Sequence, residues 1–300
     1  MPTVAVPGRL MGTAAHLHLP GDLIPRVIEL LDRLESLWSR FLPESDISRL
    51  NAASGHPVAV DIETIGLLHV MVGAHLATDG AFDPTLLAPL VGLGYGVSRD
   101  DPDRVSTIPP TAARRGDVTS MLIDHSTGEV ALPPGTILDA GGIGKGRAAD
   151  LAVEFALREG APGAMVEIGG DLRVEGQPDD AEHWTIDVLN PDRSAITDRI
   201  SLTSGAVATS SDALRAWVHD GATVHHLLDP RTGHPTDTGV VACTAIAATA
   251  AWAEVMTKPA FVHGRRRAVD LADRLGIAIR VTTADGIDHH SSRWREFDYG

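Results

Sequence analysis

Residues 138–150 read LDAGGIGKGRAAD and set a cluster of four glycines around Lys145. Glycine lets the backbone approach a ligand closely, and the first turn of a helix presents free N–H groups that suit phosphate. A helix is predicted over residues 147–159, because apolar side chains recur there at helical spacing. These side chains are Ala148, Leu151, Ala152 and Phe155. The segment therefore predicts a phosphate-binding helix start, to which Lys145 adds a compact cation.

The same segment departs from two common nucleotide-binding motifs. It lacks the Ser or Thr that follows the lysine of a Walker A loop. It also lacks the third glycine of a dinucleotide-binding fingerprint at the proper spacing. A glycine-rich turn that enters a helix, with Lys145 in solvent, remains an equally good interpretation of these residues alone.

Outward from this segment, helical and strand-like stretches alternate without regular βαβ units. Helices are expected at 22–41, 61–78 with Asp61 as N-cap, 247–263 and 265–275. Strands are expected at 164–168, 184–189, 199–203, 223–228 and 277–281, with a hairpin of 118–123 and 129–132. This mixture predicts an α+β fold. Nothing marks a domain boundary, so we expect one domain over residues 1–300.

The composition is that of a globular protein with a net charge of −15 and 43% hydrophobic residues. Such an acidic chain is a poor nucleic-acid binder, because nucleic acids attract a basic surface. No apolar run reaches the roughly 18 residues of a membrane helix, and the first residues do not resemble a secretion signal. With Cys243 as the single cysteine, no internal disulfide can form. We expect a cytoplasmic protein.

Residues 225–235 read HHLLDPRTGHP, so two histidines at a strand end precede a turn bounded by Pro and Gly. Histidine can act as an acid or base near neutral pH. The composition is also typical of a surface turn in which Asp229 caps the local backbone. A zinc site is a third alternative, although no third ligand stands at a characteristic spacing.

Two further segments could carry polar chemistry. Residues 80–85 read GAFDPT and follow the helix predicted at 61–78; alone, they are best interpreted as a loop. In the AEVMTK segment, Glu254 and Lys258 are four residues apart and share a helix face. A surface ion pair would contribute little, but the neighbours of this pair are apolar. Lys145 and Lys258 are the only lysines of the chain, which suggests a specific role for each.

Taken in order, these segments resemble the motifs of the ApbE family of FAD:protein FMN transferases. The resemblance extends from Met11 to about Gly264 and includes the segments SRF…SDISRLN at 39–51 and EIGGD at 167–171. It implies a T-fold-like α+β structure with mixed, largely antiparallel sheets. It also implies Mg²⁺-dependent transfer of FMN from FAD to a Ser or Thr hydroxyl of an acceptor flavoprotein, with release of AMP.

The resemblance also implies roles for single residues. His226, Lys145 and Asp229 would take part in catalysis. Mg²⁺ would be held by the backbone carbonyl of Gly142, by Glu254 and by Thr257. The residues implied in FAD binding are Met11, Asn51, Ala81, Phe82, Asp83, Asp139, Lys145 and Leu227.

The chain departs from the family pattern in the late helix, where Glu254 replaces an Asp and Lys258 replaces a Thr. Glutamate is still a hard oxygen ligand, but a protonated lysine cannot bind Mg²⁺. Thr257 lies about 100° around the helix from position 258. Either water replaces the lost hydroxyl at the metal, or Lys258 replaces part of the metal's charge. Two other functions therefore stay open: an FAD pyrophosphatase that gives FMN and AMP, and a non-catalytic FAD-binding protein.

Overall fold

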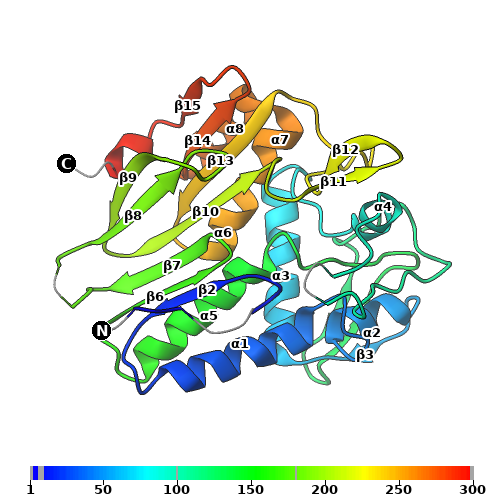
Figure 1. Cartoon of the computed structure of the whole chain (residues 1–300). Coiled ribbons are helices and arrows are strands. Elements are labelled where there is room, and N and C mark those ends of the chain that lie inside the picture. The colour runs from blue at the N-terminus through cyan, green and yellow to red at the C-terminus, as the bar shows by residue number, and fades with distance from the viewer. Residues whose placement is uncertain (1–2, 6–9, 99–100, 180, 298–300) are drawn as a thin grey trace. The chain divides into compact units, whose positions relative to one another are not determined.

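A computed structural model describes residues 3–5, 10–98, 101–179 and 181–297 of the chain. The chain forms two compact units (Figure 1). Unit 1 contains Met1–Leu31, Lys145–Ala216 and Asp237–Gly300, and unit 2 contains Asp32–Gly144 and Trp217–Thr236. The division falls within helix α1 (Ile24–Trp38), whose apolar face was expected from the sequence. The single domain expected over residues 1–300 stays a prediction.

Unit 1 is built on an eight-stranded sheet. Its strands, in spatial order, are β1 (Thr3–Ala5), β2 (Ala15–His18), β6 (Gly163–Ile168), β7 (Asp171–Gly176), β10 (Gly205–Ser211), β13 (Val240–Ala247), β14 (Ala278–Thr283) and β15 (Asp288–His290). Each neighbouring pair is antiparallel. Helices pack against this sheet, as an α+β fold requires, so the predicted fold class is confirmed.

Each face of this sheet has its own cover. Helix α6 (Ala250–Met256) contacts β7, β10 and β13, while α7 (Lys258–His263) contacts β13 and α8 (Arg265–Leu275) contacts β14. The hairpin of β8 (Trp184–Leu189) and β9 (Ile196–Leu202) shares a second apolar core with β7, β10, β13, β14 and the 3₁₀ helix Trp294–Phe297. Figure 1 shows the hairpin and the helices on opposite faces.

The prediction of one helix over residues 247–263 is wrong at its start and in its middle. Strand β13 extends to Ala247, and its side chains are buried at six of eight positions. A strand covered on both faces has no alternating pattern, so its apolar run cannot be told from a helix by periodicity. Thr249 then caps α6 by accepting a hydrogen bond from the backbone N–H of Trp252. The helix breaks at Thr257, just before Pro259 at the start of α7.

Unit 2 combines helices of 6 to 16 residues with two small sheets. Its helices are α2 (Asp46–Ala52), α3 (Ile62–Ala77) and α4 (Leu87–Gly92). Its strands are β3 (Val58–Ala59), β5 (Glu129–Ala131) and β4 (Leu122–Asp124) in one sheet, and β11 (Ala216–His219) with β12 (Ala222–His225) in the other. The predicted N-cap is confirmed, because the Asp61 side chain accepts from the backbone N–H of Glu63. The predicted hairpin around residues 126–128 is confirmed as well.

Two strands expected in unit 2 are shorter than the sequence suggested. The strand expected at 118–123 lies at Leu122–Asp124, because Asp117 ties the side chains of Thr119 and Ser120 into a polar turn. The strand expected at 223–228 ends at His225. From there the chain enters a closed loop, in which the backbone N–H of Thr236 bonds the carbonyl of Leu227.

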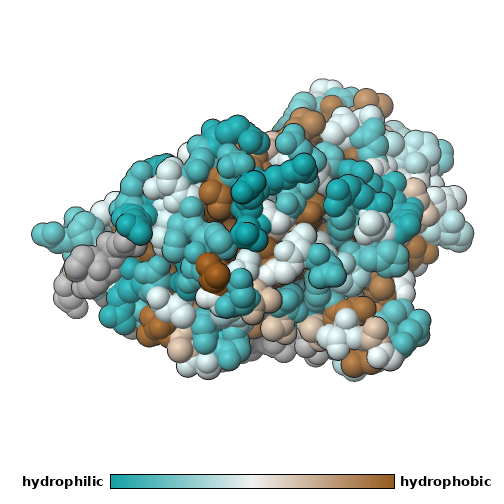
Figure 2. All heavy atoms as spheres, turned by 90° about the horizontal axis from the view of Figure 1, so that it is seen from above, coloured by the Kyte–Doolittle hydropathy of each residue, from teal (hydrophilic) through white to brown (hydrophobic). Residues whose placement is uncertain are grey.

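The surface in Figure 2 is mostly hydrophilic, with apolar side chains scattered in small groups. This agrees with the acidic composition of the chain. In the described part of the chain, no helix is both long and apolar enough to cross a membrane.

Candidate functional site

Four ionisable side chains gather in unit 1 at the start of helix α5 (Gly144–Arg158). The ammonium group of Lys145 lies 2.7 Å from Asp171 Oδ2 and also contacts Glu254 Oε1. The second oxygen of Glu254 accepts the backbone N–H of Gly146 at 2.9 Å. Lys258 donates from Nζ to the backbone carbonyl of Glu254 at 2.6 Å. We call these four side chains the lysine–carboxylate cluster.

A tight turn brings Asp171 to this cluster. Gly169 and Gly170 connect β6 to β7, and Ile168 pairs directly with Asp171 across the turn. Gly169 has φ 64°, and a Cβ there would lie 2.8 Å from the side chain of Thr13. Only glycine therefore fits this turn without strain. The backbone N–H of Gly169 bonds the carbonyl of Ala14, next to the turn that contains Met11.

Helices α5 and α6 hold each other's first turns. Glu254 of α6 accepts the N–H of Gly146 in α5. In return, Asp150 of α5 accepts the N–H groups of Ala250 and Ala251 at 2.7 and 3.1 Å. Acidic side chains at helix N-termini satisfy free N–H groups and oppose the positive end of the helix dipole. Gly146 permits this approach, because a Cβ there would collide with the carbonyl oxygen of Ala250.

Burial and neighbouring charges together set the protonation of the cluster. Burial disfavours charged Lys145, but the carboxylates of Asp171 and Glu254 outweigh this effect and raise the pKa of the lysine. Burial likewise disfavours charged Glu254, yet Lys145 and Lys258 bring its pKa below the ordinary value. Burial and the charge of Glu254 raise the pKa of Asp171 to about 6. Burial lowers the pKa of Lys258. Of the four side chains, Lys145 and Glu254 are thus the two whose pKa shifts favour the charged form.

The hydroxyl of Thr257 is turned into the protein. It donates to the backbone carbonyl of Glu254 at 2.8 Å and lies 2.7 Å from the hydroxyl of Ser210 on β10. Thr257 is completely buried. Both Thr257 and Lys258 therefore bind the last turn of α6, where helix carbonyls lack helical partners.

In unit 2, Asn51 holds the backbone just before the glycine-rich segment. Its buried amide donates to the carbonyl of Leu138 at 2.8 Å and accepts the N–H of the same residue at 2.7 Å. The next side chain, Asp139, accepts the N–H of Gly141 at 3.0 Å. Buried Arg40 lies 3.5 Å from Asp139. These contacts fix the conformation of residues 138–141.

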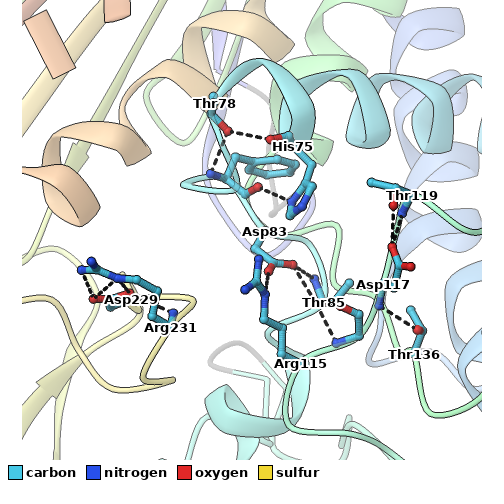
Figure 3. A network of polar contacts seen from close by, with 12 residues as sticks. His75, Thr78, Asp83, Thr85, Arg115, Asp117, Thr119, Thr136, Asp229 and Arg231 are labelled. Carbon is cyan, nitrogen blue, oxygen red and sulfur yellow. Dashed lines mark hydrogen bonds and ion pairs between the residues drawn. The ribbon is translucent and has the colours of Figure 1, made fainter. Parts of the chain in front are cut away.

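The predicted loop at residues 80–85 carries a buried carboxylate. Asp83 accepts the backbone N–H and the hydroxyl of Thr85 at 2.9 and 2.7 Å, and it pairs with Arg115 at 2.6 Å. Figure 3 shows these side chains directed toward one another. Ala81 and Phe82 are buried, and the backbone carbonyl of Phe82 contacts the imidazole Nδ1 of His75 at 2.9 Å. The segment is thus a well-ordered turn rather than a loose loop.

The turn after β12 contains the predicted histidine and aspartate. Asp229 accepts the backbone N–H of Arg231 at 2.9 Å and pairs with its guanidinium at 2.7 Å (Figure 3). The turn interpretation of this segment is thereby confirmed. His226 is partly buried and Leu227 is buried at the start of this turn. Catalytic roles for His226 and Asp229 stay predictions.

Comparison with known proteins assigns the family. The ApbE family matches residues 11–281 of this chain. The chain belongs to the ApbE family. The FAD:protein FMN transferase of Vibrio cholerae is 29% identical, over 96% of this chain and 90% of the relative. That of Klebsiella pneumoniae is 31% identical, over 79% and 75%. The resemblance found in the motifs is thus confirmed.

Solved ApbE structures share the fold. The ApbE protein of Thermotoga maritima aligns over the full length of both chains with a TM-score of 0.86 and 29% identity. The apo form of the Pseudomonas stutzeri flavinyl transferase ApbE aligns over 100% of this chain and 98% of the other, with a TM-score of 0.81 and 27% identity. These matches agree with the α+β class and the antiparallel sheets described above.

Within this ApbE chain, the structure brings some predicted residues together. Lys145, Glu254 and Thr257 lie in one region of unit 1, whereas most of the predicted FAD-binding residues belong to unit 2. The sequence did not identify Asp171 as a site residue, although the two glycines before it indicate a place where a ligand could approach the backbone. It also did not select Arg40, whose guanidinium lies 4.1 Å from the ring of Phe41 and 5.0 Å from that of Tyr95.

Proposed function

We propose that this chain transfers FMN from FAD to a Ser or Thr hydroxyl of an acceptor protein and releases AMP. The observation that carries the proposal is the partly buried ammonium group of Lys145 in the first turn of a helix, within a chain of the ApbE family. Curated relatives that align with most of the chain are named for this activity. The nature of the accepting hydroxyl rests on the family resemblance.

The reaction needs charge neutralisation and alignment more than covalent help from the protein. The hydroxyl oxygen of the acceptor attacks the phosphorus that carries riboflavin, and the bond from this phosphorus to the bridging oxygen breaks. AMP leaves with the bridging oxygen, and an FMN phosphodiester forms on the acceptor. We assign to His226 the role of accepting the proton of the acceptor hydroxyl, because a partly buried imidazole can accept a proton near neutral pH.

Lys145 is suited to the developing charge on the phosphates. An ammonium group has three N–H donors, of which Lys145 directs two to Asp171 and Glu254. The third donor is left for a phosphate oxygen. Asp171 and Glu254 keep the lysine charged and restrict its movement, so that the cation is in place before FAD arrives.

We propose that the residues implied by the resemblance take part in FAD binding, and that two of them act on the ligand indirectly. Asn51 acts on the ligand indirectly, because both ends of its amide are bonded to the backbone of Leu138. It therefore positions Asp139 and the glycines that follow. Asp83 is likewise committed to Thr85 and Arg115, so it shapes the turn that presents Ala81 and Phe82. Met11 and Leu227 stay proposals on the resemblance alone.

The Mg²⁺ expected from the resemblance stays a prediction, and the donors of unit 1 fit it poorly. Both oxygens of Glu254 already have partners, and the hydroxyl of Thr257 is held by the Glu254 carbonyl and Ser210. A cation here would also face two ammonium groups. Among the described residues, no three acidic, His or Cys side chains form a metal-binding group. We therefore assign no step of the reaction to Mg²⁺.

The direct test is flavin labelling of an acceptor. Purified protein is incubated with FAD and an acceptor domain that the Pseudomonas stutzeri flavinyl transferase labels. We expect a fluorescent flavin on the denatured acceptor, a mass increase of one FMN less one water, and an equal amount of AMP. The matched control is the same acceptor with its target Ser or Thr replaced by Ala, which should stay unlabelled.

The same assay separates the alternative functions. AMP release at the same rate without acceptor, and without label when acceptor is present, identifies an FAD pyrophosphatase. Retention of FAD without AMP under every condition identifies a binding protein. Either result contradicts the proposed transfer.

A further inference from the structure

Both lysines of this chain belong to the lysine–carboxylate cluster of unit 1. The other Lys/Arg side chains are arginines, and both lysines bond to Glu254. Lys145 faces the Glu254 side chain, and Lys258 faces its backbone carbonyl. The side chains of Asp171 and Glu254 are only 6% and 3% exposed, so their charges need partners. The lysines supply them without a metal ion.

The charges of this cluster leave no surplus negative charge for a divalent cation. The two ammonium groups balance the two carboxylates. A divalent cation added beside Lys258 would meet a like charge at close range, where repulsion is strong in a poorly hydrated site. The N–H donors of the two ammonium groups suit the oxygens of a diphosphate instead.

Lys258 has donors to offer such a ligand. Its one hydrogen bond within the described part of the chain goes to the Glu254 carbonyl and uses one of three N–H groups. The side chain is partly buried, so its remaining donors are not fully hydrated. Lys145 likewise keeps one donor, and each donor can bind a phosphate oxygen without any proton transfer.

We propose that Lys258, acting with Lys145, supplies the charge that a divalent cation would supply at the FAD diphosphate, so that this chain cleaves FAD without Mg²⁺. The inference rests on the proposed function, but it makes a claim of its own about metal dependence. It extends the second alternative left open by the sequence, in which Lys258 replaces part of the metal's charge, to replacement of the metal.

The first experiment measures AMP release from FAD by the full chain, with acceptor, in excess EDTA and in increasing MgCl₂. We expect the wild-type rate to change by no more than about twofold between the two conditions. Lys258→Thr removes the ammonium and offers a hydroxyl, so its rate in EDTA should fall by about tenfold or more and recover with Mg²⁺. Lys258→Arg, which keeps the charge, should remain active in EDTA. A merely structural role of Lys258 would not change the dependence on metal.

The second experiment measures metal binding independently of enzymatic activity. Electron paramagnetic resonance of Mn²⁺ should show no bound ion with the wild-type protein and a bound ion with Lys258→Thr. Circular dichroism spectra that match between the two proteins establish that the variant is folded. If the variant does not fold, the wild-type measurements alone decide the inference.

The outcomes separate the two claims. Wild-type activity that stops in EDTA and returns with Mg²⁺ overturns the inference and leaves FMN transfer intact. No AMP release under any condition overturns the proposed function and, with it, cleavage of FAD without Mg²⁺; the Mn²⁺ spectra then decide only whether Lys258 excludes a divalent cation. Mn²⁺ binding by the wild-type protein contradicts this exclusion, whereas binding by Lys258→Thr alone supports it.

Discussion

The two units of this protein hold their carboxylates in different ways. In unit 2, Asp83 and Asp139 each accept a backbone N–H from the residue two positions later, and an arginine adds a charge. In unit 1, Glu254 is paired with Lys145, 109 residues away. The arginine partners are distant in the sequence as well, so the contrast lies in the backbone bonds: those of Asp83 and Asp139 are local and shape turns, whereas Glu254 joins two helices. We infer that charge is most consequential in unit 1 and backbone shape in unit 2.

Removing Lys145 is the strongest test of this contrast. Lys145→Ala leaves two buried carboxylates with one fewer cation, so unfolding should require about 3 kcal/mol less free energy. FAD turnover or binding should weaken by more than about tenfold. Urea unfolding and AMP release measure the two effects. Wild-type turnover in this variant would remove Lys145 from the functional site.

A second variant separates charge balance from function. Lys145→Ala combined with Asp171→Asn removes one positive and one negative charge, so part of the lost stability should return. Turnover should stay low, because the donor to the phosphate is still absent. If the double variant is no more stable than Lys145→Ala alone, the two residues do not interact through their charges.

The contrast also explains what the sequence could predict. The Asp61 cap, the Asp229 turn and the helix after the glycines depend on neighbours in the chain, so they were predictable. The pairing of Lys145 with Asp171 depends on where β7 lies beside α5, which no local pattern specifies. Strand β13 was missed because burial on both faces removes the alternation that identifies a strand.

The two asparagines of the chain test the distinction between distant and local partners on uncharged side chains, with a smaller expected effect. Asn51 bonds the backbone of Leu138, 87 residues away, whereas Asn190 bonds Ser194 and Ala195 in its own turn. Asn51→Ala leaves a buried N–H and carbonyl without partners and should reduce the free energy of unfolding by about 2 kcal/mol. Asn190→Ala should cost about 0.5 kcal/mol, because water can replace its contacts. Equal losses in urea unfolding would contradict the distinction between distant and local partners.

A pH-dependent effect is predicted for Asp150, where burial and helix N–H groups have opposite effects on the pKa. Burial raises the pKa of Asp150 to about 6, against the two α6 N–H groups and Arg173, which lower it. Because the folded-state pKa lies above the unfolded value of 3.8, the folded protein binds the proton more tightly. The stability that this proton provides is present below the unfolded pKa and is lost as the pH rises through the folded pKa.

Asp150→Asn does not titrate at this position, so it isolates this contribution. The difference in unfolding free energy between wild type and variant should shrink by about 1 kcal/mol between about pH 5 and about pH 8. Urea unfolding at the two pH values measures it. A constant difference for Asp150 would mean that its pKa is ordinary. A difference that widens with pH would mean that the helix N–H groups outweigh burial, and the contrast between the units would then weaken.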